Sequence, residues 1–327
     1  MSTANMINAT TRPRAVLSPW RWLLAVATLA ASPGVVAEGC PAAGFPGDIA
    51  TIALIEKKPA LDRADFRDYW RDIHGVLAVR IPGFWTYTQY HLRDEIPGLS
   101  ANPKAATPIH GLAEVTYCSE QAMAGLASSA VTDLIKADEQ NAFAGTYLHG
   151  TVRGDSVTLV AESPARAPLD TDTEGTLIVL VARPAGESAA SFGARFEAAM
   201  AALPAACPTL LWARRHLFQP YQADAWQAPN VNHDPLVIHD AALELRGSRR
   251  AQALGCVVDA VIPALTARPG TSVNVYPVAG RYQMVRDGRP TLLGLRGLPA
   301  YRLIERLGAD NQASPAVLRT LYGTGHE

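Results

Sequence analysis

The residues of this chain with the clearest chemical potential lie between positions 66 and 91. Phe66, Trp70 and His74 are spaced at i, i+4 and i+8, so they fall in one row along a helical face. A histidine in such a row can accept or donate a proton near neutral pH, because its unperturbed pKa is about 6.5. The spacing therefore predicts a helix that presents an aromatic surface with one acid/base group in it.

A strand is predicted after this helix, beyond Pro82-Gly83, a pair that ends helices. Because side chains alternate along a strand, one of its faces would carry Trp85, Tyr87, Gln89 and His91. If this face packs on the helix, Gln89 can orient a carbonyl or phenol near His74, inside an aromatic wall typical of a small-molecule pocket. The alternatives are structural: a helix-end His74 bonded to backbone, and ordinary strand alternation for Gln89.

The elements that would position these residues follow a β-α-β-β-α-β order, the ferredoxin-like pattern. Asp62 can cap the helix that carries His74, and Ser119 can cap the second helix. The predicted elements are strand 49–56, the helix after Asp62, strands 84–93 and 109–118, helix 120–140, and a last strand within 147–162.

The same order begins again after a Pro-rich, acidic linker at 163–174. Strands are predicted at 177–182, 210–219, 236–245 and 273–285, and helices at 191–203 and 248–265. An offset of 126 places Phe192, Phe196, Met200 and Arg215 against Phe66, Trp70, His74 and Gln89. We interpret the second half as a copy that keeps the apolar packing positions but lacks the His and Gln side chains. It would therefore serve only as the opposite wall of the site in the first half. A helical tail at 291–327 is expected to wrap this second copy.

The first half resembles the EthD family over residues 48–162. Where that family most often has His-x-Pro-Leu-Ala, this chain has His74-Gly75-Val76-Leu77-Ala78, a mild departure. The residues that carry the resemblance are Phe66, Tyr69-Trp70, His74-Gly75, Ile81-Pro82-Gly83, Gln89, the run Ile109 to Glu114, Asp138-Glu139 and Phe143.

The resemblance implies an α+β fold of the dimeric α+β barrel superfamily. Two tandem ferredoxin-like repeats, at 38–162 and 175–290, would then form a barrel within one chain. Members and relatives have been linked to ether degradation, to polyketide-type dehydration and decarboxylation, and to haem chemistry. The expected activity is that of an oxidoreductase, lyase or isomerase on a small aromatic or polyketide-like compound. A non-catalytic binding protein that uses the same pocket is the alternative, and haem binding in the barrel is a further one.

Site residues are expected in the first copy only. His74 and Gln89 are the candidate catalytic residues. The candidate ligand contacts are Tyr69, Trp70, Trp85, Tyr87, His91 and Phe143. The acid at Asp138 is interpreted as holding the helix end or a neighbouring histidine. His110 and His149 have no metal-ligand spacing, so neither a metal nor a bound cofactor is expected.

The ends and charge of the chain bear on its location and partners. Residues 1–37 read as a secretory signal: Arg12, Arg14 and Arg21 form a positive region ahead of an apolar run at 22–31, and Val35-Val36-Ala37 precede the cleavage point. Export to the periplasm or medium is therefore predicted, with no membrane span after cleavage; an uncleaved anchor is the alternative.

A net charge of −1 with scattered arginines argues against nucleic acid as a partner. Because two copies on one chain remove the usual reason to dimerise, a monomer is expected.

The cysteine count agrees with export. Four cysteines permit two disulfides, and we expect Cys207 with Cys256 and Cys40 with Cys118. The sequence contains no CxxC, so it has neither a thioredoxin-like redox pair nor a zinc knuckle, and no CxxCH for covalent haem.

Overall fold

The computed structural model describes residues 49–99, 108–161, 169–171 and 175–323. All of these belong to one compact unit. The predicted signal at 1–37 lies outside the described residues, so export stays a prediction.

The first half of the chain follows the predicted order of elements. Its strands are arranged β4-β1-β3-β2, and every neighbouring pair is antiparallel. Asp62 Oδ1 caps the first helix by accepting from the amides of Ala64 and Asp65. The elements are β1 (Ile49–Lys57), α1 (Arg63–Tyr69), the π-helix η1 (Trp70–His74), α2 (Gly75–Ala78), β2 (Thr86–Leu92), β3 (Gly111–Tyr117), α3 (Glu120–Ser128), α4 (Ala130–Ala142) and β4 (Phe143–Gly150).

The second half arranges its strands as β10-β7-β9-β8, which is the same order. Its elements are β7 (Thr176–Ala182), α5 (Ala189–Ala206), β8 (Leu210–Leu217), the 3₁₀-helix η2 (Ala223–Ala225), β9 (Ala241–Gly247), α6 (Arg250–Cys256), the π-helix η3 (Val257–Val261), α7 (Ile262–Thr266) and β10 (Ser272–Arg286). The predicted α+β, ferredoxin-like fold class is confirmed. That the halves are copies of one sequence repeat stays a prediction.

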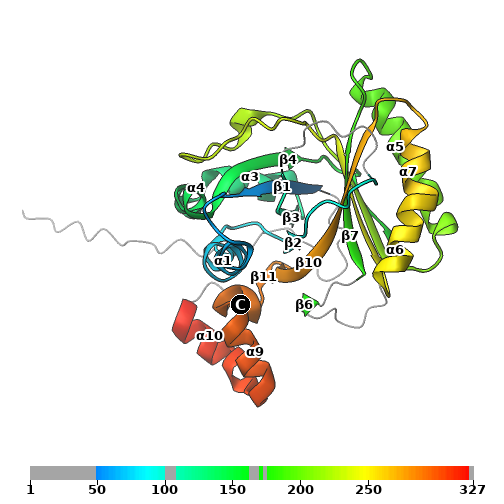
Figure 1. Cartoon of the computed structure of the whole chain (residues 1–327). Coiled ribbons are helices and arrows are strands. Elements are labelled where there is room, and N and C mark those ends of the chain that lie inside the picture. The colour runs from blue at the N-terminus through cyan, green and yellow to red at the C-terminus, as the bar shows by residue number, and fades with distance from the viewer. Residues whose placement is uncertain (1–48, 100–107, 162–168, 172–174, 324–327) are drawn as a thin grey trace, which may run out of the picture. The chain divides into compact units, whose positions relative to one another are not determined.

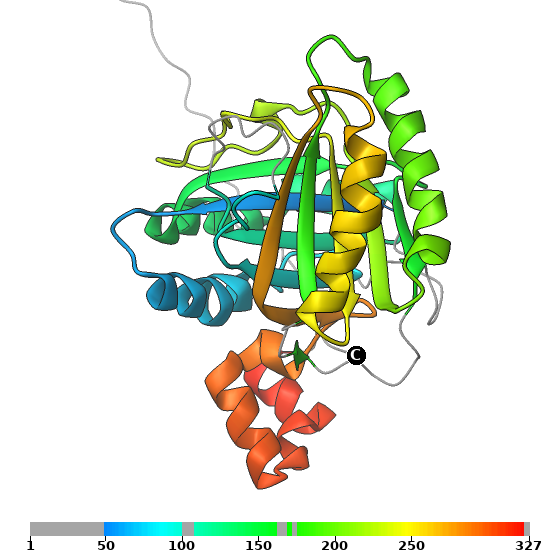
Figure 2. The same ribbon diagram turned by 45° about the vertical axis from the view of Figure 1, so that its right-hand side comes forward.

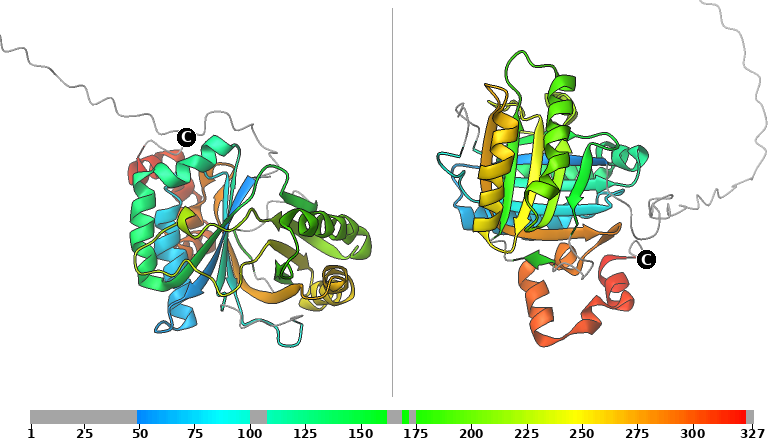
Figure 3. Two further views of the ribbon diagram at one scale, coloured as in Figure 1. Left: turned by 90° about the horizontal axis from the view of Figure 1, so that it is seen from above. Right: turned by 90° about the vertical axis from the view of Figure 1, so that its right-hand side faces the viewer.

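One long strand joins the two halves into a single curled sheet. The first part of β10, Ser272 to Pro277, pairs with β7, and the part from Val278 to Val285 pairs with β2. Helices lie on the outer faces of both halves (Figure 1), as the view from above shows (Figure 3). The sheet forms a curled half-barrel, and the path of its strands ends at β4 and at β5 (Ser156–Val160).

Three apolar layers hold this arrangement together. One lies between the first half's sheet and its helices, around Phe66, Trp70 and Ile135. A second lies between the two halves' sheet faces, and a third lies under α5, α6 and α7 (Figure 2). The middle layer contains side chains of both halves, including Tyr90, Leu112, Ile178, Leu180 and Ala242. The two sheet faces therefore pack on each other, as predicted.

Several predicted boundaries were wrong. The helix expected at 120–140 is two helices, because Ser129 is extended and its side chain caps the second by accepting from the amide of Thr132. The helix expected at 191–203 is α5, which begins at Ala189 and is capped by Ser188. Strand β9 begins at Ala241 rather than at 236.

Strand β5 (Ser156–Val160) lies inside the predicted first domain, but it pairs with β8 of the second half. The two short strands β6 (Asp170–Thr171) and β11 (Arg289–Pro290) both pair with β10. The β4–β5 segment therefore crosses from one half to the other.

The helical tail packs on the first half, not on the second as predicted. It comprises α8 (Leu292–Arg296), α9 (Leu298–Leu307), the 3₁₀-helix η4 (Asp310–Ala313) and α10 (Pro315–Tyr322). The amide of Leu298 donates to Asp72 Oδ1 at 2.7 Å, and the guanidinium of Arg80 lies over the Tyr322 ring. The reason is topological: the tail leaves β10 where that strand pairs with β2, beside the first half's helices.

The disulfide between Cys207 and Cys256 is confirmed, with their Cα atoms 5.6 Å apart. It joins the end of α5 to the end of α6. Cys118 is also disulfide-bonded, and its predicted partner Cys40 lies outside the described residues.

Candidate active site

A hydrogen-bonded pair of His74 and Asp138 joins η1 to α4 in the first half of the chain. His74 ends the π-helix η1, and its Nδ1 lies 2.9 Å from Asp138 Oδ2 on α4. The ring packs against Phe143, with centroids 5.0 Å apart. A π-helix inserts an extra residue into a helical turn and often marks a functional position. Here it turns His74, which is only 5% exposed, towards α4.

Asp138 is held as a carboxylate. Burial acts to raise its pKa, but hydrogen bonds from His74 and from the Tyr69 hydroxyl outweigh this and leave the pKa below its ordinary value. Tyr69 donates to Asp138 Oδ1 at 2.7 Å, and Asn141 Nδ2 donates to the same oxygen. An ionised Asp138 accepts from Nδ1–H of His74. In the neutral ring this tautomer leaves the lone pair on Nε2, which is the nitrogen needed to accept a proton.

His74 lines a cavity of about 70 Å³ between the sheet face and the helices. This space has room for a few water molecules or part of a small ligand. Its walls are mainly apolar and aromatic, and His74 and Glu139 are its ionisable groups apart from the phenol of Tyr87. The other lining residues include Thr51, Trp70, Phe84, Val115, Ile135, Phe143, Thr146 and Trp226.

Glu139 is a buried carboxyl group that faces this cavity. It is 3% exposed, and its Oε1 accepts a hydrogen bond of 2.8 Å from Trp226 Nε1. The Thr146 hydroxyl lies close enough to this carboxyl to act against the rise in its pKa, but neither Glu139 Oε2 nor the hydroxyl has a hydrogen-bond partner of good geometry among the described residues. Burial raises the pKa of Glu139, although the charge of a protonated His74 acts in the opposite direction. A carboxyl with a raised pKa can donate a proton near neutral pH.

The second half supplies Trp226 through the segment 218–240, between β8 and β9. Asn232 pairs with the outer edge of β4: its amide donates to Ala144 O, and its own carbonyl accepts from the amide of Thr146. His233 Nδ1 donates to Thr146 O at 2.8 Å, and its Nε2 accepts from the amide of Ala228. These bonds fix the segment over β4 and bring the Trp226 indole to Glu139.

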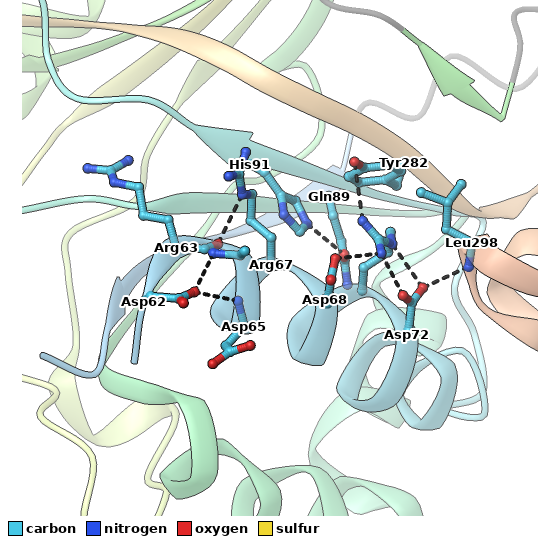
Figure 4. A network of polar contacts seen from close by, with 12 residues as sticks. Asp62, Arg63, Asp65, Arg67, Asp68, Asp72, Gln89, His91, Tyr282 and Leu298 are labelled. Atoms are coloured by element: carbon cyan, nitrogen blue, oxygen red, sulfur yellow. Dashed lines mark hydrogen bonds and ion pairs between the residues drawn. The ribbon is translucent and has the colours of Figure 1, made fainter. Parts of the chain in front are cut away.

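Gln89 and His91 lie in a neighbouring network, not on the wall of the cavity (Figure 4). Gln89 Nε2 donates to Trp70 O at 3.1 Å and to the Tyr87 hydroxyl at 2.8 Å, and Gln89 Oε1 lies 3.0 Å from His91 Nε2. His91 stacks on Trp70, with ring centroids 4.3 Å apart. Burial, helped by Arg71 and Arg67, lowers the pKa of His91 well below its usual value. This network connects the π-helix to strand β2.

A chain of ion pairs beside this network also secures the helix (Figure 4). Arg71 bonds to Asp68 and to Asp72, and its guanidinium lies over the Tyr282 ring. Asp72 also accepts from the amide of Leu298 at the start of α9. The C-terminal tail is therefore connected to the helix that carries His74.

A second polar cluster is buried between the two sheet faces, and it contains the residues best suited to hold a metal. Glu114 of β3, His216 of β8 and Glu244 of β9 converge there, with one possible ligand atom each within 4.8 Å of the others. Burial lowers the pKa of His216 to about 3 and raises the pKa values of both glutamates.

Haem does not fit the cavity beside His74. A haem macrocycle is several times larger than the cavity of about 70 Å³.

Of the predicted site residues, the structure brings Trp70, His74, Tyr87 and Phe143 to one cavity. Tyr69 supports Asp138 from behind, and Trp85 packs beside the turn at Gly288. The roles proposed for Gln89 and His91 stay predictions. No role in the site was predicted for Glu139, although it follows Asp138 directly, and no feature of the sequence indicated Trp226.

None of the helices in the described part of the chain has both the length and the apolar character that a membrane span requires.

No curated protein matches the chain. The solved structures that resemble the chain include the following three, all at low identity. The anthrone oxidase-like protein has 10% identity and a TM-score of 0.46, with 73% of this chain and 95% of that chain covered.

A candidate monooxygenase from Lactobacillus acidophilus NCFM has 11% identity and a TM-score of 0.43, covering 72% of this chain and 96% of that one. A mutant chlorite dismutase from Candidatus Nitrospira defluvii has 11% identity and a TM-score of 0.33, covering 71% and 92%. The EthD domain family matches residues 58–146, which include the π-helix, His74, Asp138 and Glu139. This chain therefore contains an EthD domain at residues 58–146.

Proposed function

We propose that this protein is an enzyme that moves protons on a small aromatic or polyketide-like compound bound in the cavity beside His74. The observation that carries the proposal is that His74, held by Asp138, and the buried carboxyl of Glu139 line the same, mainly apolar cavity. A pair of acid/base groups in an apolar pocket is a typical arrangement for proton transfer.

The roles of the two groups follow from their surroundings. His74 Nε2 takes a proton from a carbon or hydroxyl of the compound, and Asp138 stabilises the imidazolium that forms. Burial favours the protonated form of Glu139, and this form gives its proton to the substrate oxygen on which charge develops. One proton is removed and one is delivered, so the step is an enolisation, or a dehydration when the protonated oxygen leaves as water.

The aromatic walls determine the class of compound. Trp70, Phe84, Phe143 and Trp226 offer flat apolar surfaces, which suit the faces of a planar ring. The cavity as it stands holds only part of such a compound, so binding requires side chains at its rim to move apart. A non-catalytic binding protein would use the same walls but would not require His74 or Glu139.

We also propose that the protein is exported. Support comes from the Cys207–Cys256 disulfide, since structural disulfides persist in oxidising compartments, and from the signal-like residues 1–37.

The experiment is deuterium exchange into enolisable aromatic ketones, with anthrone, 1-tetralone and 2-tetralone as the panel, followed by mass spectrometry. Two near-isosteric variants separate the roles. His74→Asn keeps a donor for Asp138 and removes Nε2, and Glu139→Gln removes the acidic proton. The proposal expects the wild type to accelerate exchange of at least one ketone and each variant to lose about 10²–10⁴-fold. A wild type no faster than buffer on every ketone, or variants equal to it, would contradict the proposal, and ketone binding without exchange would favour the binding protein.

A further inference from the structure

The polar cluster between the two sheet faces lies apart from the proposed active site. Glu114, His216 and Glu244 are 5%, 0% and 1% exposed. His216 Nε2 lies 3.7 Å from Glu114 Oε1 and 3.6 Å from Glu244 Oε1. These separations are too long for hydrogen bonds, so a proton on Nε2 would not be shared with either carboxylate.

The hydrogen bonds behind His216 determine which of its nitrogens carries the proton. The Thr151 hydroxyl donates to Ala50 O, so it has no second hydrogen to give. In the bond between the two hydroxyls, Ser156 must therefore donate to Thr151 Oγ1. Ser156 Oγ, 2.9 Å from His216 Nδ1, can then only accept, and Nδ1 is the donor. In the neutral ring, this leaves a lone pair on Nε2 directed at the two carboxylates.

Three atoms that carry lone pairs consequently converge at one point. Glu114 Oε1, Glu244 Oε1 and His216 Nε2 all lack a hydrogen-bond partner among the described residues, although Arg214 Nε forms an ion pair with Glu114 Oε1 at 2.7 Å. Burying acceptors unpaired is costly. A single water has two hydrogens and cannot serve all three atoms. A cation bound between them would serve all three at once.

We propose that Glu114, His216 and Glu244 form a binding site for a divalent transition-metal ion. One imidazole and two carboxylates are the ligand set that Zn²⁺, Mn²⁺ and Fe²⁺ accept. Ligand atoms 3.6 and 3.7 Å apart are spaced like the edges of a coordination polyhedron with metal–ligand bonds of about 2.0–2.2 Å. The three ligands come from β3 of the first half and from β8 and β9 of the second, so the ion would join the two halves.

Each ligand is already oriented by a neighbour, as metal ligands usually are. Ser156 holds His216 Nδ1, the Tyr90 hydroxyl donates to Glu244 Oε2 at 2.8 Å, and Arg214 holds Glu114. Arg281, whose guanidinium lies near the Tyr90 ring, completes the charged groups around the cluster. Because two arginines already balance the two glutamates, a divalent ion adds positive charge. We therefore expect an anionic ligand, such as hydroxide, at a position that the three side chains leave open.

The test uses the full chain prepared without a polyhistidine tag. After chelator treatment and dialysis, the protein is incubated with Zn²⁺, Mn²⁺ or Co²⁺, passed through a desalting column, and analysed by elemental mass spectrometry and thermal unfolding. The proposal expects about one ion per chain for at least one of the metals, together with a higher unfolding temperature. A wild-type chain that retains none of the three ions and unfolds at the same temperature with each of them overturns it.

Two variants assign the ion to this cluster. Glu244→Gln keeps the shape and an acceptor for Tyr90 and should reduce metal affinity at least 10-fold. The matched control is His239→Gln, which changes another buried histidine with an unpartnered Nε2, outside the cluster. Retention of the ion by Glu244→Gln, or its loss from the His239 variant alone, places the ion elsewhere and overturns the assignment.

If Glu244→Gln does not fold, the visible spectrum of the wild type with Co²⁺ decides. Bands of a low-symmetry site with nitrogen and oxygen ligands support the assignment, and the spectrum of hexaaqua Co²⁺ contradicts it.

Discussion

The indole of Trp226 donates a 2.8 Å hydrogen bond to Glu139 Oε1, and through this contact the second half of the chain completes the cavity of the first. The second half was predicted to be a passive wall. Its segment 218–240 instead crosses to β4 and positions an acid of the candidate active site.

Replacing Trp226 with Phe should destabilise the protein by about 1–3 kcal/mol, because Glu139 Oε1 is left buried without its donor. It should also raise the pKa of Glu139 further, since a hydrogen bond to the charged form is lost. Urea unfolding measures the first effect. Lys136→Met, which removes only the ammonium 4.8 Å from the indole ring, is the control and should cost at most about 1 kcal/mol. Equal losses in the two variants would show that the hydrogen bond has no special weight.

Glu139→Gln should gain stability relative to the wild type as the pH rises. Burial raises the pKa of Glu139 above its ordinary value of 4.5 in the folded state. Above pH 4.5 the unfolded chain releases this proton first, so the wild type loses stability until the pH passes the raised value. Glutamine has no proton to release. The free energies of unfolding of both proteins at pH 4 and pH 7 measure the effect, and a difference independent of pH would show that Glu139 is not perturbed.

Asp138→Asn should show the opposite dependence. The pKa of Asp138 is lowered in the folded state, so its contribution to stability is full above its ordinary value of 3.8 and is lost as the pH falls through the folded-state value. The variant should therefore be less stable than the wild type at pH 7, and the gap should narrow below pH 3.8. Urea midpoints from pH 7 to pH 2.5 provide the comparison. A gap that widens in acid would mean that the His74–Asp138 contact is not ionic.

Removing the Cys207–Cys256 disulfide should cost about 2–5 kcal/mol, because the cross-link restricts the unfolded chain. The double variant with both cysteines changed to Ser avoids a lone thiol. Its unfolding midpoint should match that of the reduced wild type once Cys118 has been changed to Ser in both proteins. A double variant as stable as the oxidised wild type would show that the cross-link contributes nothing.

The helix and strand that carry the site could be predicted from periodicity alone. Phe66, Trp70 and His74 repeat at helical spacing and are all buried, and Tyr87, Gln89 and His91 share the strand face that meets them. The π-helical turn could not be predicted, because its extra residue depends on packing against α4 and β2. The role of Gln89 was also hidden, since only the structure shows that both ends of its amide are engaged.

Long-range pairing explains the remaining differences. Trp226 lies in a segment with no helical or strand periodicity, and its position depends on Asn232 pairing with β4, far away in sequence. Strand β5 has an ordinary strand pattern, but no local feature indicates that its partner is β8. Likewise, the polar residues at Glu114 and Glu244 read as interruptions of two apolar strands until the sheet faces are seen together.

The most direct test of the central claim compares His74 with Met200, which the predicted offset of 126 places against His74 and which is 1% exposed. The measurement is exchange rate per folded molecule on the most responsive ketone, with the urea midpoint recorded for the same samples. His74→Ala should lose about 10²–10⁴-fold in rate with a nearly unchanged midpoint, because Tyr69 and Asn141 still hold Asp138. Met200→Ala should keep its rate and lose about 2–5 kcal/mol of stability. Loss of rate in Met200→Ala alone, with unfolding of His74→Ala, would place the site in the other half and contradict the account.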